Sequence, residues 1–66
     1  MFKYKAVIKD NYLTKTRNKY VHAANSLDAH KFALNTVNLA KEDIVKILDE
    51  DGGTVYSLTK GFIYKH

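Results

Sequence analysis

Residues 20–34 read YVHAANSLDAHKFAL, and this stretch decides the fold. In its first part apolar residues recur at every second position, as in a strand, and in its second part they recur every three to four residues, as in a helix. Val21 and Ala23 alternate with outward-facing Tyr20 and His22, which is typical of a strand with one buried face. Asn25 or Ser26 then caps a helix, because either side chain can accept a hydrogen bond from the free amides of the first turn. The stretch therefore predicts a strand over residues 19–24 that runs directly into a helix.

The predicted helix has one apolar stripe. Ala29, Phe32, Ala33 and Val37 recur at positions i, i+3, i+4 and i+8, which places them on one face of about three helical turns. The two alanines allow close approach to a sheet, and we expect Phe32 to supply most of the buried area. Asn38 is the expected end of the helix.

Strand patterns lie on both sides of this helix. Residues 2–9 alternate, and their apolar face carries Phe2, Tyr4, Ala6 and Ile8. Residues 44–48 resume strand character, with Val45 and Ile47 expected on one face and Lys46 on the other. The remaining expected elements are a turn at residues 49–53, a return strand at 54–59, a bend at Gly61 and an extended piece at 62–64.

This order of elements predicts an α+β fold with the order β-β-α-β-β. Each element has one apolar face to bury, and the simplest arrangement is a four-stranded antiparallel sheet with the helix packed on one face. A chain of 66 residues is short enough for a single domain, so we expect residues 1–66 to form one compact unit.

Sequence motifs for catalysis or metal binding are missing. The chain contains no cysteine, which excludes disulfides and thiolate chemistry, and it has no P-loop, dinucleotide glycine pattern or zinc-protease motif. His22, His30 and His66 fall in different parts of the predicted fold. The acidic residues at 49–51 lack the remaining ligand positions of a calcium loop. We expect no enzymatic activity, no metal and no cofactor.

Localisation is suggested by two further patterns. No apolar run reaches the roughly 20 residues of a membrane span. The first ten residues carry lysines where a signal peptide needs an apolar run. We therefore expect a cytoplasmic protein with no membrane partner.

Charge is distributed unevenly along the chain. Residues 1–24 hold six basic groups and one acidic group, a balance of +5, whereas residues 25–53 hold three basic and six acidic groups, a balance of −3. Such an oriented charge predicts a nucleic-acid partner, or a protein that handles nucleic acid. The alternative is an ordinary solvated surface. The sheet face away from the helix is expected to carry Lys3, Lys5, Lys9, Tyr20, His22 and Lys46.

Three segments resemble a known family. AANSLDAHKFA at residues 23–33, VIKD at 7–10 and DIVKILDEDGG at 43–53 are similar to a small phage-encoded anti-CRISPR of type I-F. The shared features are Ala23-Ala24, Ala29, Ala33, and the pair His30-Lys31 in place of two basic residues. Asn35 stands where the family has a lysine, and Val37 where it has a glutamine.

The resemblance implies an inhibitor that acts in the cytoplasm of a bacterial host. The family binds the Cas7 backbone of the CRISPR surveillance complex and prevents target DNA from hybridising with the guide. By position the resemblance implies a partner-binding set on the outer helix face, at His30, Lys31 and Asn35. If the protein is such an inhibitor, we expect basic residues of the first hairpin to flank this contact: Lys15, Arg17 and Lys19. A possible second surface is Lys5, Lys9, Tyr20 and Lys46. The alternatives are a small basic nucleic-acid-binding accessory protein, or a phage inhibitor of another host defence or toxin protein.

Overall fold

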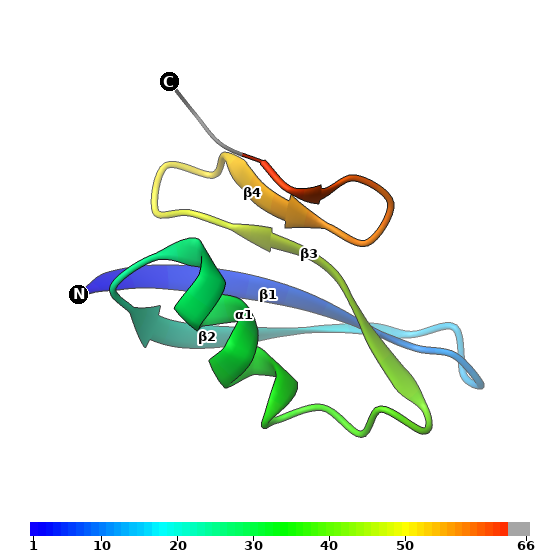
Figure 1. The fold of residues 1–66 in the computed structure, drawn as a ribbon. Helices are drawn as coiled ribbons and strands as arrows, with labels where there is room; N and C mark the ends of the chain where they lie inside the picture. Colours follow the sequence, from blue (N-terminus) through cyan, green and yellow to red (C-terminus); the bar gives the residue numbers. More distant parts are fainter. Residues whose placement is uncertain (64–66) are drawn as a thin grey trace.

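The computed structural model describes residues 1–63, which form one five-stranded antiparallel sheet and one helix. The strands are β1 (Phe2–Asp10), β2 (Thr16–Ala23), β3 (Glu42–Leu48), β4 (Thr54–Ser57) and β5 (Gly61–Phe62), and the helix α1 spans Ser26–Leu34. The strand order is β2-β1-β3-β4-β5, and α1 lies across one face of the sheet (Figure 1). The predicted α+β fold is confirmed, with a fifth strand added to the four expected.

Strand β1 lies between β2 and β3, the two other long strands of the sheet. It pairs with β2 on one side and with β3 on the other, antiparallel to both. Helix α1 connects β2 to β3 and therefore crosses over β1, and it contacts β2 more extensively than any other strand (Figure 1). Within residues 1–63 no other helix covers the sheet, so the opposite face of β1 and β2 faces solvent.

The apolar residues of β1 and β3 meet on the helix side of the sheet. Tyr4, Ala6 and Ile8 are buried there, as their alternation predicts. In β3 the buried pair is Ile44 and Ile47, which are three residues apart.

A β-bulge explains the spacing in β3. Val7 pairs with Lys46 while Ile8 pairs with Ile44, so Val45 is an extra residue in the strand. The prediction that Val45 and Ile47 share one face is therefore wrong: Ile47 is fully buried, whereas Val45 is only partly buried and lies outside the core cluster. A strict period of two cannot hold across an inserted residue.

The core is a compact apolar cluster between α1 and the sheet. Leu34, Val37 and Tyr56 pack against its edge. Strand alternation places Phe2 on the predicted core-facing side of β1. It is nevertheless 55% exposed, because it is the first residue of β1 at the end of the sheet. The buried members are Tyr4, Ala6, Ile8, Val21, Ala23, Ala29, Ala33, Ile44, Ile47 and Val55.

Helix α1 begins and ends through local hydrogen bonds. The side chain of Asn25 accepts from the backbone N–H of Asp28 at 2.9 Å, so Asn25 is the N-cap. At the other end the Thr36 N–H donates to the Ala33 carbonyl at 3.0 Å, three residues back, and this tightened turn closes the helix. The expected end at Asn38 is therefore too late.

The helix face that packs on the sheet differs from the predicted stripe. Ala29 and Ala33 are buried, but Phe32 is 43% exposed, so its assignment to the core is wrong. His30 and Leu34 are partly buried instead. The packed sector is thus rotated about the helix axis, away from Phe32 and toward His30. The reason lies in β4 and β5, which supply aromatic side chains beneath His30.

The end of the described chain adds the fifth strand. Gly61 has a φ of +74°, a conformation that glycine adopts without steric cost, and it permits the tight return after β4. Phe62 then pairs with Tyr56. The predicted bend is confirmed, while Tyr64 of the expected extended piece lies outside the described residues.

Candidate functional site

The uncovered sheet face gathers the basic residues of β1. Alternation turns these lysines away from α1, and the register sets Lys3 opposite His22, Lys5 opposite Tyr20 and Val7 opposite Lys46. We call this surface the open face. Its basic and aromatic members are Lys3, Lys5, Lys9, Tyr20, His22 and Lys46, as the sequence predicted.

An aromatic ring lies among these lysines. Tyr20 is 53% exposed, and the Nζ atom of Lys3 lies 4.8 Å from the centroid of its ring. This is a cation–π contact, which leaves the ammonium group hydrated and holds the two side chains together. The open face therefore combines positive charge with an accessible π surface.

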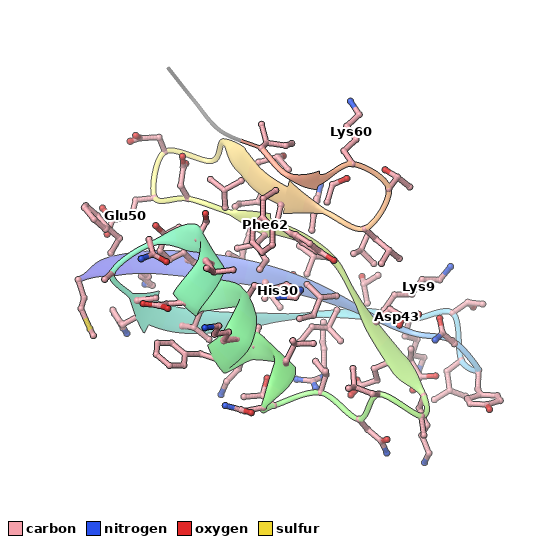
Figure 2. The ribbon with its side chains drawn as sticks, in the orientation of Figure 1. Lys9, His30, Asp43, Glu50, Lys60 and Phe62 are labelled. Carbon is pink, nitrogen blue, oxygen red and sulfur yellow. The ribbon has the colours of Figure 1, made fainter. Side chains whose placement is uncertain are left out.

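The far end of the open face is less basic. Lys9 pairs in register with Asp43 of β3, and the two side chains lie close together in Figure 2. The Asp43 carboxylate accepts a hydrogen bond from the Asn11 side chain at 2.8 Å. This carboxylate reduces the positive potential around Lys9.

A shallow hollow of about 310 Å³ lies at the other end of the open face. Its walls include Tyr20 of β2, Leu48 of β3 and Glu50 of the β3–β4 turn, with Lys3 and Lys5 between them. The Glu50 Oε1 atom accepts from the backbone N–H of Lys3 at 2.8 Å, which ties the turn to β1. The sequence pattern does not indicate Leu48 or Glu50 as site residues, because only the pairing of β1 with β3 brings them beside Tyr20.

The structure leaves most members of the predicted partner-binding set on the helix and first hairpin exposed to solvent. Lys31 and Asn35 are exposed, as are Lys15 and Lys19 on the hairpin. Lys19 pairs with Ala6 and so belongs to the helix side of the sheet, away from the open face.

His30 departs from its predicted outward position. Its ring centroid lies 4.4 Å from that of Tyr56 and 5.4 Å from that of Phe62, and Figure 2 shows His30 directed from α1 toward Phe62. Burial lowers the pKa of His30 below its ordinary value of 6.5. His30 therefore acts as a packing residue between α1 and the β4–β5 hairpin, and its imidazole is favoured in the neutral form.

Arg17 is also engaged within the fold. Its Nε atom lies 3.0 Å from Glu42 Oε2, and its Nη2 atom donates to Glu42 Oε1 and to the Thr36 carbonyl, each at 3.2 Å. The hydrogen bond from Arg17, with one from the Asn38 backbone, lowers the pKa of Glu42 to about 2. The same contact raises the pKa of Arg17. This link joins β2 to the start of β3 and to the end of α1.

Residues 1–63 contain no group of three or more histidine or carboxylate side chains arranged to hold a metal ion. The one helix in that part of the chain is too short and too polar to cross a bilayer.

The class of protein defined by these features is a small α+β protein with a basic, aromatic-bearing open sheet face. No protein-family model, curated protein or solved structure matches the chain. The surface chemistry of the chain itself is therefore the basis for proposing a function.

Proposed function

We propose that the protein binds single-stranded nucleic acid on its open face. The observation that carries this proposal is the placement of Lys3 and Lys5 beside the exposed ring of Tyr20, with Lys46 on the same uncovered sheet surface. Lysines neutralise backbone phosphates, and an aromatic ring stacks on a base. Helix α1 lies on the other side and leaves this surface accessible.

Single strands fit this surface better than a duplex does. The π face of Tyr20 is useful only to a base that has left its stack, which a paired base cannot do without cost. A duplex groove is ordinarily read by a helix or by a two-stranded ribbon that inserts into it. The open face is instead part of a broad sheet.

The test is a salt titration with a fluorescently labelled oligonucleotide. Binding of a single-stranded oligothymidylate, followed by anisotropy, should weaken with salt at a log–log slope of about −0.7 per neutralised phosphate. Contacts from all four lysines of the open face would give a slope of about −3. Lys5→Gln and Lys46→Gln should each weaken binding and flatten the slope by about 0.7.

Lys60→Gln is the matched control, because Lys60 projects from the β4–β5 connection, away from β1 and β2 (Figure 2). This variant removes the same charge and should leave affinity almost unchanged. A salt-independent affinity, or equal losses in Lys60→Gln and Lys5→Gln, would contradict the assignment to the open face.

A second proposal is inhibition of a host CRISPR surveillance complex through its Cas7-type subunits. The resemblance of residues 23–33 to a type I-F anti-CRISPR supports it, as does the exposure of Lys31 and Asn35 on α1. The packing of His30 against Tyr56 weakens this second proposal, because only Lys31 of the pair implied by the resemblance is displayed outward.

Retention of the purified surveillance complex on the tagged protein would test this second proposal. Lys31→Glu combined with Lys19→Glu should abolish retention while leaving thermal stability near the wild-type value, since both side chains are exposed. Failure of the tagged protein to retain the surveillance complex would rule out this second proposal. Selective capture of a different purified defence or toxin protein would redirect the proposal to that target.

A further inference from the structure

We infer that the hollow beside Tyr20 is a pocket for one unpaired nucleobase, and that it prefers guanine. This inference rests on the proposed binding of single-stranded nucleic acid and names the part of the strand that is recognised. The hollow measures about 310 Å³, which is at the small end of ligand pockets and suits a single base rather than a larger ligand.

The walls of the hollow suit a flat ring. The Tyr20 side chain comes from β2 and that of Leu48 from β3, and Lys5 is the register partner of both on β1 between them. A base inserted here would stack on the tyrosine ring and contact the leucine on its other side. The methylene groups of Lys3 and Lys5 add apolar surface below, while their ammonium groups remain near the flanking phosphates.

Glu50 is the residue that selects which base the hollow binds. Its carboxylate is held at the rim of the hollow, because Oε1 accepts from the Lys3 backbone N–H at 2.8 Å. Figure 2 places Glu50 at the end of the sheet where β1 begins. A carboxylate has about four lone-pair positions, so this bond leaves capacity for two further donors.

Guanine is the base that matches such an acceptor. Its Watson–Crick edge presents two adjacent donors, N1–H and N2–H, which a carboxylate can accept together. Adenine and cytosine each place one amino donor beside a ring acceptor, and thymine flanks its single N–H with two carbonyls. Single-stranded bases are ordinarily read along this edge. A negative carboxylate would repel the acceptors of the other three bases.

The experiment uses four labelled single strands, an oligothymidylate and the same strand with one central dG, dA or dC. The strand with dG should bind at least about five-fold more tightly than the strand with dA. Glu50→Gln should abolish this preference, whereas Asp51→Asn, an exposed change in the same turn, should retain it. Tyr20→Ala should weaken binding of the dG strand about ten-fold, and Tyr20→Phe should restore it because the ring is kept.

Tyr12→Ala is the control for loss of an exposed tyrosine, since Tyr12 is 75% exposed in the β1–β2 connection. Oligothymidylate binding that Tyr20→Ala weakens, but that shows no dG preference, would overturn the base pocket and leave the proposed function standing. A dG preference that survives Glu50→Gln would also overturn it. Absence of binding to all four strands would overturn both.

Discussion

The imidazole ring of His30 packs on the phenol ring of Tyr56, with centroids 4.4 Å apart and ring planes inclined by 45°. Phe62 completes the group, with its centroid 5.4 Å from that of His30 and 5.1 Å from that of Tyr56. These three rings join α1 to the β4–β5 hairpin, which lies at the far side of the sheet from β2. Short strands at an edge need such side-chain packing to stay docked.

Removal of the His30 ring should destabilise the fold. His30→Ala is expected to lower the free energy of unfolding by about 1–2 kcal/mol, because two aromatic contacts are lost. In a domain of this size each kcal/mol corresponds to about 4–8 °C in Tm. Lys31→Ala, on the exposed side of the same turn, should change stability by less than about 0.5 kcal/mol. Equal effects of the two changes would contradict the packing role of His30.

Stability should depend on pH through His30. Because burial lowers the pKa of His30 in the folded state, the unfolded chain binds a proton more readily below its ordinary pKa of 6.5. The stabilisation is therefore fully present above about pH 6.5 and is lost as the pH falls through the lower folded-state value. Thermal melts between pH 8 and 5 should show this loss in the wild type and in His22→Gln, but not in His30→Phe.

The Arg17–Glu42 pair should stabilise the fold under mildly acidic to neutral conditions. The pKa of Glu42 is lowered to about 2, so its contribution is present above the ordinary value near 4.5 and is lost as the pH falls through about 2. Glu42→Gln should lower the urea midpoint at pH 7, and the two proteins should converge as the pH approaches 2. Asp51→Asn is the control, and a similar convergence in that variant would argue against a specific role for Glu42.

Phe32 and Ile47 should differ in the cost of truncation. Ile47 is fully buried, so Ile47→Ala should cost about 2–5 kcal/mol. Phe32 is 43% exposed, and Phe32→Ala should cost about half of the 3–5 kcal/mol seen for a fully buried phenylalanine. Urea unfolding of both variants would decide the order. A larger loss for Phe32→Ala would mean that the helix presents its Phe32 face to the sheet.

Alanine substitution at Asn25 and at Ser26, the two candidate N-caps of α1, should change the free energy of unfolding by different amounts. Asn25 accepts the Asp28 N–H at 2.9 Å, so Asn25→Ala should cost about 1 kcal/mol. Ser26 is the first residue of α1 and not its cap, and Ser26→Ala should be close to neutral. Chemical denaturation measures both. A greater loss in Ser26→Ala would reassign the cap.

The sequence by itself determined the features that depend on neighbours a few residues away. Alternation over residues 2–9 placed Tyr4, Ala6 and Ile8 on the buried side and the lysines on the open face. The choice between Asn25 and Ser26 located the start of α1 to within one residue. These outcomes were predictable because strand alternation and helix capping are local, so distant parts of the chain do not change them.

Tertiary structure alone decided which residues of the helix and of β3 face the core. His30 turned inward and Phe32 outward because Tyr56 and Phe62, far along the chain, offer aromatic surfaces beneath one sector of α1. The bulge at Val45 arises only where β3 pairs with β1, and the same pairing creates the hollow between Tyr20 and Leu48. The spacing of apolar residues indicates which face of a helix or strand is most hydrophobic. Which face is buried also depends on the surface against which that helix or strand packs.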